Sequence, residues 1–535
     1  MFDKERGLYV AHGPNGPISI IGKMANRHGL ISGATGTGKT VTLQVLAETF
    51  CQAGVPCFMA DMKGDLSGIS QAGAMSKFIE KRCPEFGIED PQFEGCPTRF
   101  YDVFGEQGHP MRSTISNMGP QLLSRLLGLN ETQEGVMNIV FRVADERGLL
   151  LIDLKDLRSM LAYVSKHASE YTATYGNVSP ASVGAIQRAL LTLENQGAEK
   201  FFGEPSFDIY DLLQCEQGKG VMSVLAADKL MMNPKLYSTF LLWLLSDLYA
   251  QLPEVGDLDY PKLVFFFDEA HTLFDDTSKA LIDKIEQVVR LIRSKGVGVY
   301  FVTQNPTDVP DSIAGQCGNR VQHALRAFSP KEQKVVKAAA ETFRVNPEFD
   351  TEAAIMELET GEALVSFLDE KGAPSVVERA KILFPLSQIG AISEGQREKC
   401  IKGSRIYGRY DTMIDRESAF EVLLAESEAA TKAAEEVAAK EQAAKEEAAK
   451  AKEEEKEKKA AKKKKSIGKT ILGAAVGAAI TSVSNSISTE VANKATGKKT
   501  TKKTTGKDVA NKAIKSATNS LTKQLTRSIL GNLLK

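Results

Sequence analysis

The residues best suited to chemistry form a glycine-rich segment near the amino end of the chain. Residues 33–40 read GATGTGKT and fit the pattern G-x-x-x-x-G-K-[ST] in full. Gly29–Ser32 before them favours a buried strand, and Val41–Phe50 after them has the apolar spacing of a helix. Glycines let successive backbone N–H groups point at a phosphate, and the helix adds its positive end. These flanks argue against a chance match in a glycine-rich turn, so the segment predicts a nucleotide-phosphate site.

The segment is expected to hold both the phosphates and a metal ion. Lys39 can reach the β- and γ-phosphates of a nucleotide, and the Thr40 hydroxyl can hold Mg²⁺. The residues predicted to bind the phosphates are Gly33, Ala34, Thr35, Gly36, Thr37, Gly38, Lys39 and Thr40.

A second pair of reactive side chains, Asp268 and Glu269, lies in the segment KLVFFFDEAH (262–271). The apolar run Leu263–Phe267 predicts a strand buried on both faces, and open parallel sheets bind ligands at the carboxyl ends of their strands. Asp268 would hold Mg²⁺ through water, and Glu269 would orient and deprotonate the attacking water. Two acidic residues also commonly open a helix, but beside a complete phosphate loop the catalytic interpretation is favoured.

Other polar residues follow predicted strands and could reach the same site. Gln304 comes after the strand 297–302 and could sense the γ-phosphate or position water, with a turn or helix cap as the alternative. Asp61 and Lys63 follow an earlier strand; contact with nucleotide, water or substrate and a local salt bridge in an ordinary turn are equally supported. His28 is expected to be a packed structural residue.

Arg320 and Arg326 stand at the start and near the end of another predicted strand, residues 319–328. An arginine that reaches the γ-phosphate of a neighbouring subunit stabilises transition-state charge and couples the subunits of a ring. A surface salt bridge without function is the ordinary alternative. Arg320 is the arginine predicted to act in catalysis, together with Glu269 and Gln304.

These elements predict an α/β fold with a central, mostly parallel sheet. Residues 7–21 predict a β-hairpin beside the strand of the phosphate loop, and residues 363–382 predict a second hairpin. From roughly residue 107 to 215, helical apolar spacing without clear strands predicts a large helical insertion. The predicted parts are 1–106, the N-terminal hairpin and first part of the core; 107–215, the insertion; 216–415, the second part of the core; 416–465, an Ala/Glu/Lys-rich helix; and 466–535, a basic tail.

The end of the chain differs in composition from the rest. Residues 421–465 are almost entirely Ala, Glu and Lys, whose i,i+4 pairs favour a long solvated helix, without the a/d seam of a coiled coil. Residues 466–535 hold twelve basic and two acidic residues, although the whole chain has a net charge of −1. This helical or disordered tail could bind nucleic acid, an anionic membrane surface or a protein partner, and a flexible solubilising role is equally supported. Its apolar run 471–480 is shorter than the roughly 20 residues that span a bilayer.

The composition is ordinary for a soluble globular chain, with 42% hydrophobic and 25% charged residues. The seven cysteines show no C-x-x-C spacing, and the charged N-terminus MFDKERGLYV lacks the apolar run of a signal peptide. Together they predict reduced thiols and a cytoplasmic protein.

Five motifs in order resemble the HerA-like ATPases of the HerA/FtsK group of ring translocases. They are His28 before GLISGATGTGKT, DMKGD at 61–65, FFFDEAH at 265–271, VTQNP at 302–306 and GNRVQHALRAF at 318–328. Within that group the chain is most similar to bacterial proteins of the YjgR type, which have a helicase HerA-like C-terminal domain. The resemblance covers about residues 7–410 and leaves the tail out.

The resemblance implies a RecA-like P-loop NTPase core that assembles into a homo-hexamer and moves along double-stranded DNA with ATP and Mg²⁺. It places Arg320 at the position of an arginine finger. It carries over the roles given above for Lys39, Thr40, Asp268, Glu269 and Gln304. Archaeal members have an N-terminal β-barrel, which the short segment here cannot form, and the helical insertion is a second difference.

Three functions agree with these residues. A DNA motor predicts DNA-stimulated ATP hydrolysis and an affinity that falls with salt. An ATPase that acts on a protein or membrane surface through residues 466–535 predicts hydrolysis indifferent to DNA. A nucleotide-gated scaffold would hydrolyse little, and Glu269 argues against it because a sensor has little use for a positioned base. The resemblance favours the DNA motor, whereas the residues alone support a Mg-ATP hydrolase.

Overall fold

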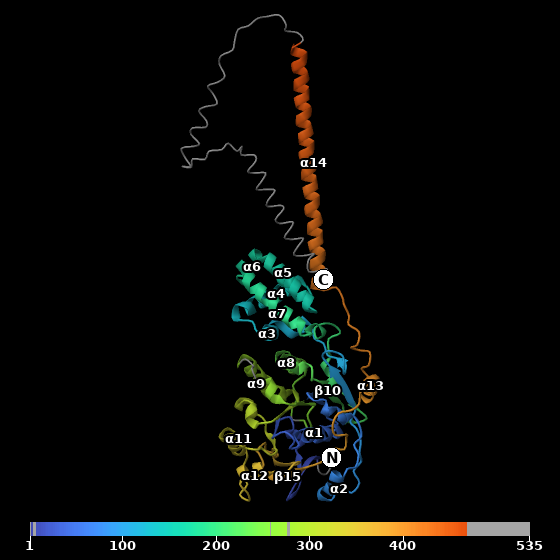
Figure 1. The fold of residues 1–535 in the computed structure, drawn as a ribbon, viewed down its shortest axis with the longest axis vertical. Helices are drawn as coiled ribbons and strands as arrows, with labels where there is room; N and C mark the ends of the chain where they lie inside the picture. The colour runs from blue at the N-terminus through green and yellow to red at the C-terminus, as the bar shows by residue number, and fades with distance from the viewer. Residues whose placement is uncertain (1, 4–6, 257, 275–278, 468–535) are drawn as a thin grey trace. The chain divides into compact units, whose positions relative to one another are not determined.

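The computed structural model describes residues 2–3, 7–256, 258–274 and 279–467. The chain divides into two compact units, residues 1–434 and 435–535. The first unit holds the sheet and most of the helices labelled in Figure 1. Residues 468–535, on which the predictions for most of the basic tail and for its apolar run fall, lie outside the described residues.

One large sheet organises the first unit. Within the described residues it has 13 strands in the order β1-β2-β15-β14-β13-β4-β12-β11-β5-β10-β6-β7, with β3 paired to β2. The strands are β1 (Phe2–Asp3), β2 (Gly7–Gly13), β3 (Gly16–Ile20), β4 (Gly29–Ser32), β5 (Cys57–Asp61), β6 (Thr98–Asp102), β7 (His109–Pro110), β10 (Met222–Ala226), β11 (Leu263–Phe267), β12 (Val297–Thr303), β13 (Asn319–Gln322), β14 (Glu362–Ser366) and β15 (Glu378–Ile382). Two further strands, β8 (Cys215–Glu216) and β9 (Lys219–Gly220), pair with each other.

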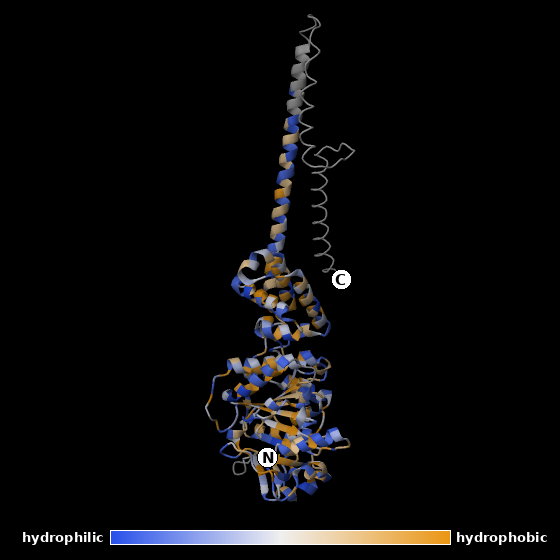
Figure 2. Cartoon of the chain, turned by 90° about the vertical axis from the view of Figure 1, so that its left-hand side faces the viewer, coloured by the Kyte–Doolittle hydropathy of each residue, from blue (hydrophilic) through white to orange (hydrophobic). Residues whose placement is uncertain are grey.

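The strands from β13 to β7 all run parallel. β4, β5, β10, β11 and β12 are buried along their whole length, which explains their continuous apolar runs. Figure 2 shows hydrophobic residues gathered in these central strands. β14, β15 and β2 continue the sheet in antiparallel pairing. The predicted α/β class with a central, mostly parallel sheet is confirmed.

The N-terminal hairpin forms as predicted but lies elsewhere in the sheet. β2 pairs with β3 and, through His12 and Lys381, with β15. The prediction that it lies beside the strand of the phosphate loop is wrong, because both edges of that strand are occupied. Gly29 of β4 is in register with Asn319 of β13 on one side and with Tyr300 of β12 on the other. The second predicted hairpin, β14 with β15, forms and separates β2 from β13.

Helices cover both faces of the sheet. α1 (Lys39–Gln52) packs on one face, where Phe50 contacts Phe266 and Tyr300. α8 (Pro234–Gln251) and α9 (Lys279–Ile292) share the core of the opposite face, which takes the alternate residues Phe265 and Phe267 of β11. The other α-helices are α2 (Lys77–Arg82), α3 (Ile115–Leu126), α4 (Glu131–Arg147), α5 (Leu154–Lys166), α6 (Ala168–Tyr175), α7 (Pro180–Asn195), α10 (Asp311–Ala314), α11 (Pro330–Glu341), α12 (Thr351–Glu357), α13 (Glu394–Gly403) and α14 (Ala419–Ile467).

Helices α3–α7 occupy the stretch for which the sequence predicts a helical insertion, and they gather together in Figure 1. Four of them begin at a side-chain cap, in which Thr114, Asn130, Asp153 or Ser179 accepts an N–H of the first turn. Their apolar faces join the same hydrophobic cluster as α8 and α9, and α3 contacts α8 directly. The insertion is therefore packed on the core rather than attached by a linker.

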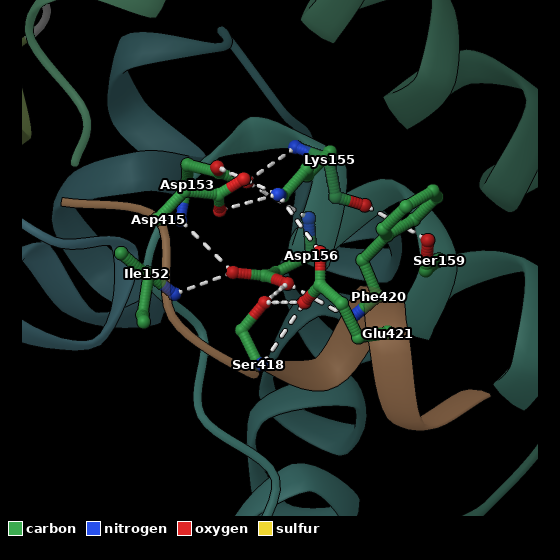
Figure 3. Close-up of polar contacts among 9 residues, drawn as sticks. All are labelled: Ile152, Asp153, Lys155, Asp156, Ser159, Asp415, Ser418, Phe420 and Glu421. Carbon is green, nitrogen blue, oxygen red and sulfur yellow. Dashed lines mark hydrogen bonds and ion pairs between the residues drawn. The ribbon is translucent and has the colours of Figure 1, made fainter. Parts of the chain in front are cut away.

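A dense polar cluster fixes the start of α14 on α5 (Figure 3). The buried Asp156 accepts hydrogen bonds from the Phe420 amide (2.9 Å), the Ile152 amide (2.8 Å) and the Ser418 hydroxyl (2.5 Å). Lys155 donates to Glu421 over 2.9 Å. Burial raises the pKa of Glu421, but hydrogen bonds from Ser418 and Lys155 outweigh it and bring that pKa to about 2. The first turn of α14 is thus held to the insertion.

Beyond its first turns α14 is hydrophilic. Residues 428–452 are all exposed, and the described part of the second unit is a continuation of this single helix. No helix among the described residues combines the length and the apolar character that crossing a bilayer requires.

Candidate functional site

Four neighbouring strands bring the predicted site residues to one edge of the sheet. β4, β12, β11 and β5 are adjacent and parallel, so their carboxyl ends meet there. The phosphate loop follows β4, Gln304 follows β12, Asp268 and Glu269 follow β11, and Lys63 lies just past β5. This is the edge at which open parallel sheets bind ligands.

The phosphate loop turns tightly from β4 into α1, which begins at Lys39. Gly36 and Gly38 have φ values of 79° and 116°, a left-handed conformation that glycine adopts without strain. The Lys39 ammonium donates to the carbonyl oxygens of Gly33 (2.6 Å) and Ala34 (3.0 Å). Burial lowers the pKa of Lys39, and the negative charges of the acidic pair act against it. The Lys39 side chain therefore folds back onto the phosphate loop in this structure.

His323, for which the sequence predicts no role, packs against this loop. It is fully buried, and its Nδ1 lies 2.9 Å from the carbonyl oxygen of Glu362 while its Nε2 lies 2.7 Å from the Thr42 hydroxyl. A carbonyl only accepts, so Nδ1 carries the proton and Nε2 accepts from Thr42. Burial lowers the pKa of His323 to about 4 and keeps the ring neutral. A Cβ added at Gly33 would lie 2.5 Å from the His323 Cβ, so only glycine fits against this part of His323.

The acidic pair is buried directly beyond β11. Burial and the charge of Glu269 raise the pKa of Asp268 to about 7. Glu269 has φ 46° and ψ 49°, a left-handed conformation that is strained for a residue with a side chain. Such strain persists where the surrounding structure enforces it, and it commonly marks functional sites.

Three side chains surround the Glu269 carboxylate. The Lys63 ammonium lies 2.5 Å from Oε1, the Gln304 amide donates to Oε2 over 3.3 Å, and the His271 Nδ1 lies 3.5 Å from Oε2. Burial raises the pKa of Glu269, but the hydrogen bond and charge of Lys63 outweigh it, so this pKa lies below its ordinary value. The structure thus brings together Glu269 and Gln304, and it adds Lys63 to them.

The donor set fits a nucleotide with a divalent cation. Burial and the neighbouring Glu269 carboxylate both disfavour the ionised form of Asp268, and a divalent cation would favour that form. The Thr40 hydroxyl and the Asp268 carboxylate are oxygen ligands of the kind Mg²⁺ prefers. Lys39 could exchange its hydrogen bonds to the loop carbonyls for hydrogen bonds to a phosphate.

Arg320 lies at the start of β13, away from the edge that carries the acidic pair. Its guanidinium donates to the carbonyl oxygens of Ala314 (2.9 Å) and Cys317 (3.2 Å), which closes the end of α10. Arg326 is exposed and donates to the Met356 carbonyl. Neither arginine contacts the phosphate loop of its own chain in the described contacts.

Two other residues singled out in the sequence have roles within the fold. His28 is buried, and its Nδ1 accepts from the Val299 amide over 3.0 Å, as expected of a packed structural residue. Asp61 accepts from the Gly64 amide over 2.8 Å and so shapes the turn that presents Lys63. Burial raises the pKa of Asp61 to about 6.

One family model matches most of the chain. The model described as "Helicase HerA-like C-terminal" matches residues 8–498, which extends past residue 410, where the resemblance was expected to end. Among solved structures, the bacterial conjugative coupling protein TrwB in its unbound form has a TM-score of 0.46 and 15% identity, covering 72% of this chain and 91% of that chain. VirB4 of Thermoanaerobacter pseudethanolicus has a TM-score of 0.45 and 15% identity, covering 71% of this chain and 97% of that chain. No curated protein sequence matches.

Proposed function

Because the chain belongs to the helicase HerA-like C-terminal family, we propose that it is an ATP-hydrolysing ring motor that acts on double-stranded DNA. The observation that supports ATP hydrolysis is the geometry of Glu269. This buried residue follows β11 in a strained backbone conformation, and its carboxylate accepts a hydrogen bond from Gln304. Family membership supports the ring and the DNA. We place the protein in the cytoplasm as a homo-hexamer.

In this proposal each group of the site has one task. The backbone amides of residues 33–40 and the Lys39 ammonium bind the phosphates. The Thr40 hydroxyl and Asp268 would hold Mg²⁺, and the ion would supply positive charge beside the phosphates. Glu269 takes the proton of the attacking water, and Gln304 orients the same carboxylate or the water.

Arg320 is our candidate for the cation that a neighbouring subunit contributes. Its guanidinium donates to two carbonyl oxygens of its own chain, so in a ring it must exchange them for the phosphate of the neighbour. A charged guanidinium gains more from a phosphate than from neutral carbonyls, which favours the exchange.

The test is ATP hydrolysis by the full chain with and without linear duplex DNA, at several salt concentrations. Glu269→Gln removes the base and should lower kcat by about 10²–10⁴-fold while nucleotide binding persists. Glu398→Gln is the matched control, because Glu398 pairs with Lys402 on the exposed surface of α13. We expect stimulation by DNA that weakens with salt and is absent in Glu269→Gln.

Each other outcome points to a different function. Strong hydrolysis indifferent to DNA would refute the DNA motor and favour a protein or membrane-surface partner for residues 466–535. No hydrolysis by the wild-type chain, with Mg-ATP bound, would refute the enzyme itself.

A further inference from the structure

Both oxygens of the carboxylate proposed as the catalytic base accept hydrogen bonds from side chains of its own chain. Lys63 lies 2.5 Å from one oxygen of Glu269, and Gln304 and His271 lie 3.3 Å and 3.5 Å from the other. A general base must present a free oxygen lone pair to a water molecule. The Lys63 ammonium occupies one lone pair of Oε1 at short distance, and it therefore competes with the attacking water for this carboxylate.

Lys63 reaches Glu269 because the sheet places their loops side by side. Ala60 of β5 is in register with Phe267 of β11, so the residues just beyond these two strands are neighbours. The turn after β5 is fixed by the Asp61 carboxylate, which accepts from the Gly64 amide, and by the left-handed conformation of Gly64. The lysine backbone is therefore held, and its long side chain spans the gap.

Of the two partners, the lysine is the one free to move. Its side chain is 56% exposed, whereas that of Glu269 is 9% exposed and attached to a strained backbone. Lysine carries its charge on a flexible four-carbon stem, and solvent can take over its hydrogen bonds. Separation of the pair thus requires only that Lys63 swing outward.

We propose that Lys63 is a positioning residue that holds Glu269 in an arrested arrangement, and that ATP hydrolysis requires Lys63 to release it. This inference rests on the proposed ATPase activity of the same site, and it adds an internal restraint to that activity. Gln304 would keep its hydrogen bond to Glu269 after release and so hold the carboxylate in place.

The first experiment compares steady-state hydrolysis without DNA in Lys63→Met, Lys63→Arg and wild type. Methionine keeps the length and the apolar stem but removes the charge, so basal kcat should rise about fivefold, the scale of a half-exposed ion pair, with KM unchanged. Arginine keeps the charge and should restore a basal kcat close to that of wild type. Lys402→Met on α13 is the matched control, because Lys402 also holds a glutamate in an exposed pair.

A fall or no change of kcat in Lys63→Met would overturn the proposal, since a lysine that assists the chemistry or only supports the fold cannot restrain it. Turnover without DNA that appears only in Lys63→Met, with a wild type that hydrolyses ATP once DNA is added, would support it. Because no DNA is present, hydrolysis that proves indifferent to DNA refutes the motor but leaves this restraint intact.

A second measurement reads the contact itself without any turnover. Acetylation of lysines by acetic anhydride, quantified by mass spectrometry, should be slow at Lys63 in the wild type and severalfold faster in Glu269→Gln. Lys402 in the same samples serves as the internal reference. Equal labelling of Lys63 in both proteins would overturn the arrested arrangement.

Discussion

Replacement of His323 by asparagine should make the stability of the core less sensitive to acid. Burial lowers the pKa of the folded His323 to about 4, against an ordinary value of 6.5. As the pH falls below 6.5, His323 binds a proton in the unfolded chain but stays neutral in the folded chain. The stability that the neutral ring contributes is therefore complete above pH about 6.5 and is lost as the pH falls toward 4.

The size of the effect follows from these two values. At about 1.4 kcal/mol per pH unit, the interval from 6.5 to about 4 gives a full loss of about 3 kcal/mol, and about 2 kcal/mol is already lost at pH ~5. Asparagine has no proton to take up, and its side-chain amide can still donate to the carbonyl oxygen of Glu362. His28→Asn offers an independent comparison, because burial also lowers the pKa of His28 to about 4.

The assay is urea unfolding of the full chain followed by the fluorescence of Trp243, the single tryptophan, which is 1% exposed on α8. The free energy of unfolding is measured for wild type and His323→Asn near pH 7.5 and near pH 5. The advantage of wild type should shrink by about 2 kcal/mol at the lower pH. An advantage that stays constant would refute the buried neutral histidine beneath the phosphate loop.

Three further predictions follow from contacts of single residues. Gly33→Ala should weaken the binding of a fluorescent ATP analogue by about tenfold or more, because its Cβ would lie 2.5 Å from that of His323; unchanged affinity would contradict the tight bracing. Gln304→Ala should lower kcat by about tenfold in steady-state kinetics, since the catalytic carboxylate loses an oriented donor, and an unaltered kcat would remove it from the site. Lys155→Met should speed amide hydrogen exchange at the start of α14, where two carboxylates lose a shared cation; exchange no faster than in Arg142→Met, which breaks an exposed pair within α4, would contradict this.

The central strands could be predicted because burial on both faces leaves a continuous apolar run in the sequence. The segments Gly29–Ser32 and Leu263–Phe267 coincide residue by residue with β4 and β11. The HerA-like family inferred from five ordered motifs is confirmed, whereas the similarity to the YjgR type stays a prediction. The place of the N-terminal hairpin could not be predicted, because a strand's own pattern does not say which distant strand occupies its edge.

Part of the candidate site could also be predicted from the sequence. Asp268, Glu269 and Gln304 were recognisable as polar residues at the ends of apolar strands. For Lys63 the sequence left contact with a ligand and a local salt bridge equally open, and the structure shows an ion pair with a residue 206 positions away. That pairing depends on the register of β5 against β11, which has no local signature. His323 carried no signal because its importance comes from its contact with Gly33 in the distant phosphate loop.

Three polar side chains of the site are hydrogen-bonded within the chain in this structure. Lys39 donates to loop carbonyls, Lys63 pairs with Glu269, and Gln304 donates to the same carboxylate. A nucleotide that binds here must exchange these internal contacts for its own, so its net affinity is smaller than the sum of its contacts.

The exchange has different consequences at the two lysines. Release of Lys39 leaves neutral carbonyls behind, whereas release of Lys63 leaves a buried anion beside Asp268, which Mg²⁺ or a water proton must then satisfy. Phosphate binding through Lys39 can therefore precede the freeing of Glu269, and this order would let the site fill before it reacts.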